Sequence, residues 1–395
     1  MKYTAISLCL LLMACHKEDT ETIPLKQLWK STLHTQDDTG TTIPPYLLEN
    51  GILFSSDPLD GDYRGYYLLD KHTGQQVWHW KDNLTPIESH TSSDIIGNAN
   101  GKIVINNRRD RYCIDQFSGK TIWKVKDDWD YGSVILQHNT SIFCGKTLGY
   151  PNAHLVRYSF DDHDAHIVWT NPTDSANMRE YDNPRAITQV DGDDWILFSD
   201  GFVNYDSGKG HPWMTCYNLG ADTLVWRRMI SDPWFHAGVY STIVHNNRIY
   251  VAESFHVVCL DLFTGEEIWR RTYGNSVHWS GIAIFNENLF AICEDQTFDM
   301  ISLENGSLLN RENGIGANTS QMKFHKGKIY YVSGADGLLY CYNATTGKLL
   351  WTMEGPELKK NRDLSFDSAG IAIDPDTDML YITDYRHAYG FQILE

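Results

Sequence analysis

A nine-residue pattern that recurs along the chain constrains its fold more than any other feature. One copy is Asp261-Leu-Phe-Thr-Gly-Glu-Glu-Ile-Trp269, and Asp70–Trp78, Asp115–Trp123 and Asn343–Trp351 repeat it. In each copy an Asp or Asn stands eight positions before a Trp, and a Gly stands four before it. An Asp or Asn side chain caps a tight turn, and Gly supplies the positive φ that such turns need. Each copy therefore predicts a strand, a hairpin turn and a second strand.

The spacing of the copies predicts how these hairpins are arranged. Successive Trp anchors lie 45, 46, 57 and 43 residues apart, and a degenerate copy with Asn in place of Trp follows after 41. The last anchor follows after another 41 residues. A period in the low forties with several strands per repeat is typical of a β-propeller with four-stranded blades. The anchors are Trp78, Trp123, Trp169, Trp226, Trp269, Asn310 and Trp351.

The two ends of the chain complete the count of blades. Three strands without a fourth are expected after the last anchor, at 368–373, 379–383 and 388–393. At the other end, Lys26–Leu33 reads as a single strand with a Trp and no preceding hairpin. The simplest arrangement lets this N-terminal strand complete the last blade and close the ring, which removes exposed strand edges. We predict an all-β, eight-bladed propeller; if the copy at Asn310 is a loop, the alternative is seven-bladed.

Composition agrees with an all-β protein and excludes one class of partner. Aromatic residues make up 13% of the chain, and large flat side chains pack well on pleated sheets. A net charge of −18 argues against nucleic acid as a partner. Six cysteines beyond the N-terminus show no zinc-binding spacing, and we expect them to be buried structural thiols rather than disulfides. They are Cys113, Cys144, Cys216, Cys259, Cys293 and Cys341.

Residues 1–15 carry a targeting signal rather than part of the fold. Lys2 is followed by a short apolar run that ends at Leu12-Met-Ala-Cys15, which resembles a bacterial lipoprotein signal with Cys15 as the lipidated residue. Ordinary secretion with cleavage after Ala14 is the alternative. His16-Lys17-Glu18-Asp19 resembles a signal that exports lipoproteins to the cell surface. Residues 16–25 would be a flexible tether and 26–395 the propeller. We expect a lipid anchor at the bacterial outer membrane, on the periplasmic or the cell-surface side, and residues 16–19 weakly favour the cell surface.

The repeat Asp-x-x-Thr-Gly-x-x-[Ile/Val/Leu]-Trp resembles that of the PQQ-like, or quinoprotein-type, eight-bladed β-propellers, over almost all of residues 26–395. That superfamily contains quinone-dependent alcohol dehydrogenases and also non-enzymatic lipoproteins, such as the scaffold subunit of the outer-membrane β-barrel assembly machine. The resemblance implies that the repeat Trp residues dock between neighbouring blades. These are Trp78, Trp123, Trp169, Trp226, Trp269 and Trp351.

The dehydrogenase branch is the first functional hypothesis, and the sequence argues against it. In that branch a Ca²⁺, an Asp base and a vicinal disulfide hold the quinone, but this chain has no adjacent Cys pair. It also lacks the length for cofactor-covering insertions, so we expect no enzyme and no cofactor. Oxygen-rich loops with Gly bind Ca²⁺ in some proteins, yet turns favour Asp and Gly for conformational reasons alone. Among three acidic clusters, Asp374, Asp376 and Asp378 are the best Ca²⁺ candidates, although we do not expect a bound ion.

The connections that precede the inner strands line one mouth of a propeller's funnel, and loops on rigid scaffolds carry function. Exposed Trp, Tyr and Arg anchor ligands and partners, although these residues would equally fill the funnel between converging strands. The insertion Asn171–Pro184 lengthens the unit ending at Trp226 and should project from the same face. The candidate ligand or partner residues are His90, Trp129, Tyr131, Tyr181, Arg185, Trp234, His236, His278, Trp279 and Arg362.

These observations favour a monomeric, non-catalytic, lipid-anchored platform that binds or assembles other envelope proteins. The alternative is a surface lipoprotein that binds a glycan beside polysaccharide-uptake machinery, because flat aromatic residues with His and Arg suit a sugar. In both hypotheses the lipid on Cys15 is the contact with the membrane.

Overall fold

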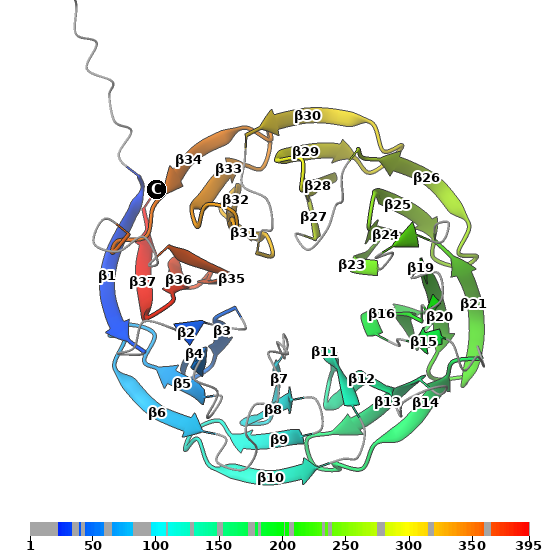
Figure 1. The fold of residues 1–395 in the computed structure, drawn as a ribbon, viewed down its shortest axis with the longest axis horizontal. Helices are drawn as coiled ribbons and strands as arrows, with labels where there is room; N and C mark the ends of the chain where they lie inside the picture. The colour runs from blue at the N-terminus through cyan, green and yellow to red at the C-terminus, as the bar shows by residue number, and fades with distance from the viewer. Residues whose placement is uncertain are drawn as a thin grey trace, which may run out of the picture.

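In the computed structural model the strands form a closed ring of eight four-stranded blades, with one additional small sheet (Figure 1). None of the described segments is a helix long and apolar enough to span a membrane. The described residues are 23–33, 39–40, 44–58, 65–81, 96–107, 110–126, 130–147, 153–172, 178–180, 183–200, 202–204, 209–230, 234–235, 239–274, 281–314, 320–358 and 365–394.

Blades 1 to 4 run from blue to green in Figure 1, each numbered from its innermost strand outward. Blade 1 contains β3 (Tyr46–Leu48), β4 (Gly51–Pro58), β5 (Gly65–Leu69) and β6 (Gln76–Lys81), with β2 (Thr39–Gly40) paired to the end of β4. Blade 2 contains β7 (Ile96–Ala99), β8 (Lys102–Asn107), β9 (Asp110–Asp115) and β10 (Thr121–Lys126). Blade 3 contains β11 (Asp130–His138), β12 (Ser141–Thr147), β13 (Ala153–Ser159) and β14 (His166–Thr170). Blade 4 contains β16 (Asn183–Val190), β17 (Asp193–Ser199), β20 (Trp213–Asn218) and β21 (Thr223–Met229).

Blades 5 to 8 complete the ring. Blade 5 contains β23 (Val239–His245), β24 (Arg248–Glu253), β25 (His256–Asp261) and β26 (Glu267–Thr272). Blade 6 contains β27 (Ile282–Phe285), β28 (Asn288–Cys293), β29 (Thr297–Ser302) and β30 (Leu308–Asn313). Blade 7 contains β31 (Lys323–His325), β32 (Lys328–Val332), β33 (Leu339–Asn343) and β34 (Leu349–Met353). Blade 8 contains β35 (Phe366–Asp374), β36 (Met379–Asp384), β37 (His387–Ile393) and β1 (Leu25–Thr32).

The predicted ring closure is confirmed, because β1 is the outermost strand of blade 8. It pairs antiparallel with β37 from Leu25 opposite Ile393 to Thr32 opposite His387. The strand starts one residue earlier than the sequence boundary at residue 26 suggests. The degenerate unit that ends at Asn310 folds as blade 6, so the eight-bladed prediction is confirmed and the seven-bladed alternative is wrong.

Neighbouring blades contact each other through the Trp of the outermost strand. Its indole Nε1 donates a hydrogen bond to a backbone carbonyl in the repeat turn of the next blade, one residue after the residue that opens that turn. Both partners are buried or half-buried, so each bond stabilises the contact by about 1 kcal/mol. The pairs are Trp29 with Lys71 (3.1 Å), Trp78 with Gln116 (2.9 Å), Trp123 with Phe160 (2.9 Å), Trp226 with Leu262 (2.8 Å) and Trp269 with Leu303 (3.1 Å).

Two repeat Trp residues lack this bond, and the local sequence explains both. The Nε1 atoms of Trp169 and Trp351 are buried without a hydrogen-bond partner among the described residues. Trp169 faces the turn of blade 4, where Asn218-Leu-Gly-Ala-Asp222 replaces the repeat pattern, and its ring packs edge-on against Tyr217 instead. Trp351 faces blade 8. There the two outer strands, β37 and β1, come from opposite ends of the chain, so no turn connects them.

The buried cysteines accommodate the Trp side chains, as their predicted structural role requires. Cys113, Cys216, Cys259 and Cys341 are fully buried, and each pairs across the sheet with a repeat Trp. Cross-strand partners share a face of the sheet, so a small side chain leaves room for a large one. All six described cysteines are free thiols, which confirms the prediction that they do not form disulfides with one another.

Blade 6 reverses these sizes. Met300 stands where blades 2, 4, 5 and 7 have Cys, and it pairs with Asn310, which stands where those blades have Trp. The Asn310 Nδ2 atom donates to the Gly347 carbonyl at 3.1 Å and so contacts the same turn as a Trp would. A Cβ added to Gly347 would lie 3.2 Å from the Met300 Sδ atom, so Met300 fills the volume next to this turn.

This exchange predicts the result of restoring the repeat. Asn310→Trp alone should lower the free energy of unfolding by about 1–3 kcal/mol, because the indole would overpack against Met300. Adding Met300→Cys should recover most of that loss, and denaturant unfolding of the two single variants and the double variant measures the coupling. A double variant less stable than Asn310→Trp alone would show that the two sizes do not compensate.

Candidate functional site: the loop face

The ring has two faces with different chemistry. We call one the turn face: it carries the repeat turns, such as Asp261 to Gly265, and the tight hairpins between the first and second strands of each blade. The Asp261 Oδ1 atom accepts bonds from the Phe263 amide (3.0 Å), the Thr264 amide (2.9 Å) and the Thr264 hydroxyl (3.0 Å). We call the opposite side the loop face: it carries the connections between blades and between the second and third strands.

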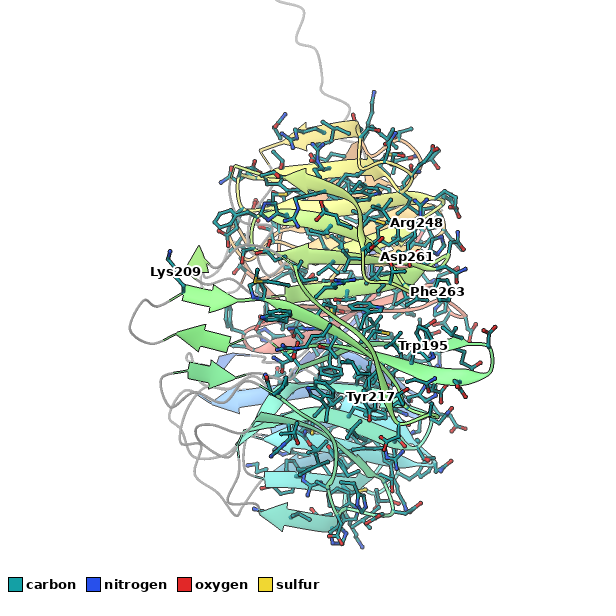
Figure 2. All side chains as sticks on the ribbon, turned by 90° about the vertical axis from the view of Figure 1, so that its right-hand side faces the viewer. Trp195, Lys209, Tyr217, Arg248, Asp261 and Phe263 are labelled. Carbon is teal, nitrogen blue, oxygen red and sulfur yellow. The ribbon has the colours of Figure 1, made fainter. Side chains whose placement is uncertain are left out.

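A small sheet projects from the loop face of blade 4. It consists of β15 (Met178–Glu180), β18 (Phe202–Asn204), β19 (Lys209–His211) and β22 (Trp234–Phe235), in that order. β15 precedes β16, β18 follows β17, β19 precedes β20 and β22 follows β21, so the sheet repeats the strand order of blade 4 and extends it. Figure 2 shows Lys209 on one side of the ring and Asp261 and Phe263 on the other. We call β15, β18, β19 and β22 the projecting sheet.

The sequence indicated only part of this sheet. β15 lies in the insertion 171–184 that was expected to project from this face. The connections that contain β18, β19 and β22 also contribute; Trp234 of β22 was a predicted partner residue, but none of these three strands was predicted. The 57-residue spacing before Trp226 was the available signal, but it does not show that the extra residues are divided between two connections. The connection that contains β22 comes after Trp226 and falls in the ordinary 43-residue interval.

A buried ion pair lies where the projecting sheet joins blade 4. Asp200, which directly follows β17, is fully buried, and its Oδ2 atom accepts a bond from the Arg227 Nε atom at 2.5 Å. The other carboxylate oxygen accepts from the Thr215 hydroxyl at 2.9 Å. Burial raises the pKa of Asp200, and Arg227 acts against that rise. The Arg227 guanidinium also lies 4.3 Å from the Trp213 ring centroid.

Two further contacts attach this junction to its surroundings. The Asn171 Nδ2 atom donates to the Asp200 carbonyl at 3.3 Å, which connects the end of blade 3 to blade 4. The Arg185 Nε atom, on β16, donates to the Ser199 hydroxyl at 3.2 Å. All of these residues belong to blades 3 and 4 or directly follow their strands, so their contacts hold together the end of blade 4 from which the projecting sheet continues.

The same face overlies most of the buried polar residues. Of the buried polar and charged residues that the structure describes, all but Gln116, His325 and Asp374 lie in the half of their strand or connection nearest the loop face. Several are carboxylates at strand ends: the Glu253 Oε2 atom pairs with the His256 Nδ1 atom at 2.6 Å, and the Asp384 Oδ2 atom with the His387 Nδ1 atom at 3.0 Å. Burying a charged group costs free energy unless the group is paired, so these carboxylates depend on their histidine partners.

One carboxylate of this layer joins two blades. Asp299 on β29 is fully buried and accepts two bonds from Arg311, from Nε at 2.6 Å and from Nη2 at 2.7 Å. The Arg271 Nη2 atom, on β26 of blade 5, reaches the same carboxylate at 3.2 Å. The hydrogen bond to Asp299 raises the pKa of Arg311.

A cleft of about 540 Å³ opens on the loop face beside blades 7 and 8. Gly334 to Gly337, in the connection between β32 and β33, line it together with Glu354, Leu358 and Ser365. The Asp336 Oδ2 atom at its edge accepts a bond from the Tyr340 hydroxyl at 2.7 Å, so this carboxylate is held in place.

The structure describes few of the predicted partner residues in full. Arg185 lies at the base of the projecting sheet, Trp234 belongs to β22 within it, and Tyr131 belongs to β11 of blade 3. The remaining predictions lie outside the described residues: His90, Trp129, Tyr181, His236, His278, Trp279 and Arg362.

The Ca²⁺ candidates lie on the turn face, and two of them contact lysines. Asp374 is buried, and its Oδ2 atom lies 3.0 Å from the Lys71 Nζ atom. The Asp378 carboxylate meets His325 Nε2 at 2.8 Å and Lys326 Nζ at 2.7 Å, while the Asp376 amide donates to Asp374. Within the described ranges, no group of three His, Cys, Asp or Glu side chains is arranged to hold a metal ion.

One feature implied by the resemblance to the dehydrogenase branch is missing from this chain. The resemblance implies adjacent cysteines beside the quinone, but the sequence has no adjacent Cys pair, and each described cysteine is buried within a blade.

Comparisons with known proteins give the same fold. A PQQ-repeat family model described as outer membrane protein assembly factor BamB matches residues 212–320. No curated protein matches the sequence. The structure of BamB from Moraxella catarrhalis is similar with a TM-score of 0.59 at 14% identity, over 93% of this chain and 99% of that chain. A europium-containing methanol dehydrogenase is similar with a TM-score of 0.66 at 11% identity, over 93% of both chains.

A quinohemoprotein alcohol dehydrogenase from Pseudomonas putida HK5 is also similar, with a TM-score of 0.64 at 10% identity, over 94% of this chain and 76% of that chain. Identities this low show a shared fold and leave the activity open, since one fold hosts many functions.

Proposed function

We propose that this chain, a PQQ-like β-propeller that resembles BamB, is a non-catalytic platform that binds other envelope proteins through its loop face. A lipid on Cys15 would anchor it to the bacterial outer membrane. The observation that carries the proposal is the projecting sheet: among the described residues, blade 4 is continued by a separate four-stranded sheet, and a buried ion pair lies at the end of the blade where this sheet begins. An element that departs from an otherwise regular repeat and is carried on a rigid scaffold is suited to recognition.

Site-specific photo-crosslinking in the bacterium that encodes the chain tests this proposal. A photoreactive residue at position 209 lies in the projecting sheet, and one at position 263, where Phe263 is 45% exposed, lies on the turn face as a matched control. We expect a discrete crosslinked envelope protein at 209 and none at 263. Adducts of equal yield at both positions, or none at either, would contradict binding through the loop face.

The two alternatives have distinct signatures. If the purified protein oxidised alcohols in a dye-linked assay after addition of PQQ and Ca²⁺, it would be an enzyme. Saturable binding of a polysaccharide that is lost in Trp234→Ala would favour the glycan-binding alternative, because a sugar ring stacks on the flat face of an indole. We expect neither result.

A further inference from the structure

The N-terminal segment enters the ring on the turn face of blade 8. Leu25 lies opposite Ile393, and the Leu394 amide donates to the Pro24 carbonyl at 2.8 Å. The Ile393 amide donates to the Asp378 carbonyl at 2.8 Å, and Asp378 belongs to the turn between β35 and β36. The start of β1 is therefore next to a turn, on the side opposite the loop face.

The projecting sheet lies at the other pole of the molecule. It extends blade 4, and blade 4 stands across the ring from blade 8, as β21 and β1 do in Figure 1. It also projects from the loop face, whereas β1 starts at the turn face. The entry point of the chain and the projecting sheet thus lie on opposite faces of the ring and on opposite sides of its axis.

The length of the segment before β1 limits how the ring can lie on a membrane. Nine residues separate Cys15 from Leu25. Nine residues span about 30 Å when fully extended and about 17 Å on average as a flexible chain. A six-residue strand is about 20 Å long, and the three-residue strands of the sheet add about 10 Å. A ring lying with its loop face down would need the tether fully extended, whereas a ring lying on its turn face or on blade 8 would not.

We propose that the short tether holds the projecting sheet away from the membrane and presents it to partners in the surrounding aqueous space. This inference rests on the lipid anchor of the proposed function. The tether acts by its length and its point of entry, and no contact between protein and lipid is required.

Energy transfer on vesicles measures this orientation. The full-length lipoprotein is placed in vesicles of phosphatidylethanolamine and phosphatidylglycerol that carry headgroup-attached acceptors. A donor is attached to Lys26→Cys, at the start of β1, or to Lys209→Cys, in the projecting sheet; both lysines are exposed strand residues. The six described native cysteines are fully buried, and burial raises the pKa of Cys113 to about 11 and that of Cys216 to about 12, so these thiols do not compete for the label at neutral pH.

We expect transfer at position 26 to be several-fold stronger than at position 209. As a control, thirty Gly and Ser residues inserted after Thr20 should bring the two efficiencies close together, because a flexible tether of that length spans about 34 Å on average. Equal transfer at the two positions with the native tether, or stronger transfer at 209, would overturn the proposal.

The experiment contains no partner protein, so it separates the two proposals. If no crosslink forms at position 209 while energy transfer is much stronger at position 26 than at position 209, the binding platform is refuted and the orientation stands. Crosslinks at position 209 with equal transfer refute the orientation alone. Failure of the chain to remain on vesicles refutes the lipid anchor and the orientation with it.

Discussion

Replacing Gly265 by Ala should lower the free energy of unfolding by about 3 kcal/mol, of which about 1 kcal/mol is backbone strain and the rest overpacking. Gly265 has a φ of +68°, which L side chains rarely adopt. A Cβ at this position would lie 2.6 Å from Cδ2 and 2.7 Å from Cε3 of Trp226, the Trp that blade 4 inserts against this turn. The ring would have to move, and its hydrogen bond to the Leu262 carbonyl would weaken. Guanidinium unfolding followed by Trp fluorescence measures the effect.

Gly327 provides a matched control, because a substitution there introduces the backbone strain without the overpacking. Its φ is +75°, yet nothing lies within 4 Å of an added Cβ. Gly327→Ala should therefore cost only the backbone strain of about 1 kcal/mol. A further check combines Gly265→Ala with Trp226→Ala: the double variant should lose less than the sum of the single losses, since the clash disappears with the indole. Equal losses for Gly265→Ala and Gly327→Ala would contradict a role for the turn in joining blades.

Asp299→Asn is expected to destabilise the protein by about 3 kcal/mol, at the lower end of the range for a broken buried ion pair. The fully buried carboxylate accepts bonds from two arginines, and Asn cannot accept both bonds of Arg311 in the same geometry. The expected loss is at the lower end because Arg271 and Arg311 retain 20% and 33% of their side-chain exposure and remain partly hydrated. Denaturant unfolding of the purified variant gives the value.

Glu267→Gln is the surface counterpart within the neighbouring blade. Glu267 pairs with Arg270 at 2.6 Å, but its side chain is 41% exposed. Exposed pairs contribute about 0–1 kcal/mol, so this substitution should change stability little. If Asp299→Asn cost no more than Glu267→Gln, then the buried layer beneath the loop face would not stabilise the contact between blades 5 and 6.

The parts of the fold that the sequence predicted depend on short-range chemistry that repeats. The Asp at position 261 and the Gly at position 265 determine a turn because the carboxylate accepts amides two and three residues on, and Gly adopts the required φ. The single Trp strand around Trp29 predicted ring closure, because an edge strand without a partner is unfavourable. Even the degenerate copy at Asn310 kept its spacing and folded as a blade.

The loop face was less predictable because its contacts join distant residues. Asp200 and Arg227 are 27 residues apart, and no pattern in the sequence distinguishes them from surface charges until β17 and β21 lie in one blade. The compensating pair Met300 and Asn310 is likewise visible only once their strands are in register.

The sequence by itself therefore determined the repeat and the closure of the ring, because turns and Trp spacing act within a few residues, and it favoured eight blades over seven until the structure showed that the unit at Asn310 is a blade. Only the tertiary structure decided which face carries the buried charges and that blade 4 extends beyond the ring. Those features arise from strand pairings between separate connections, whose partners are chosen when the blades pack and not by local conformational preference.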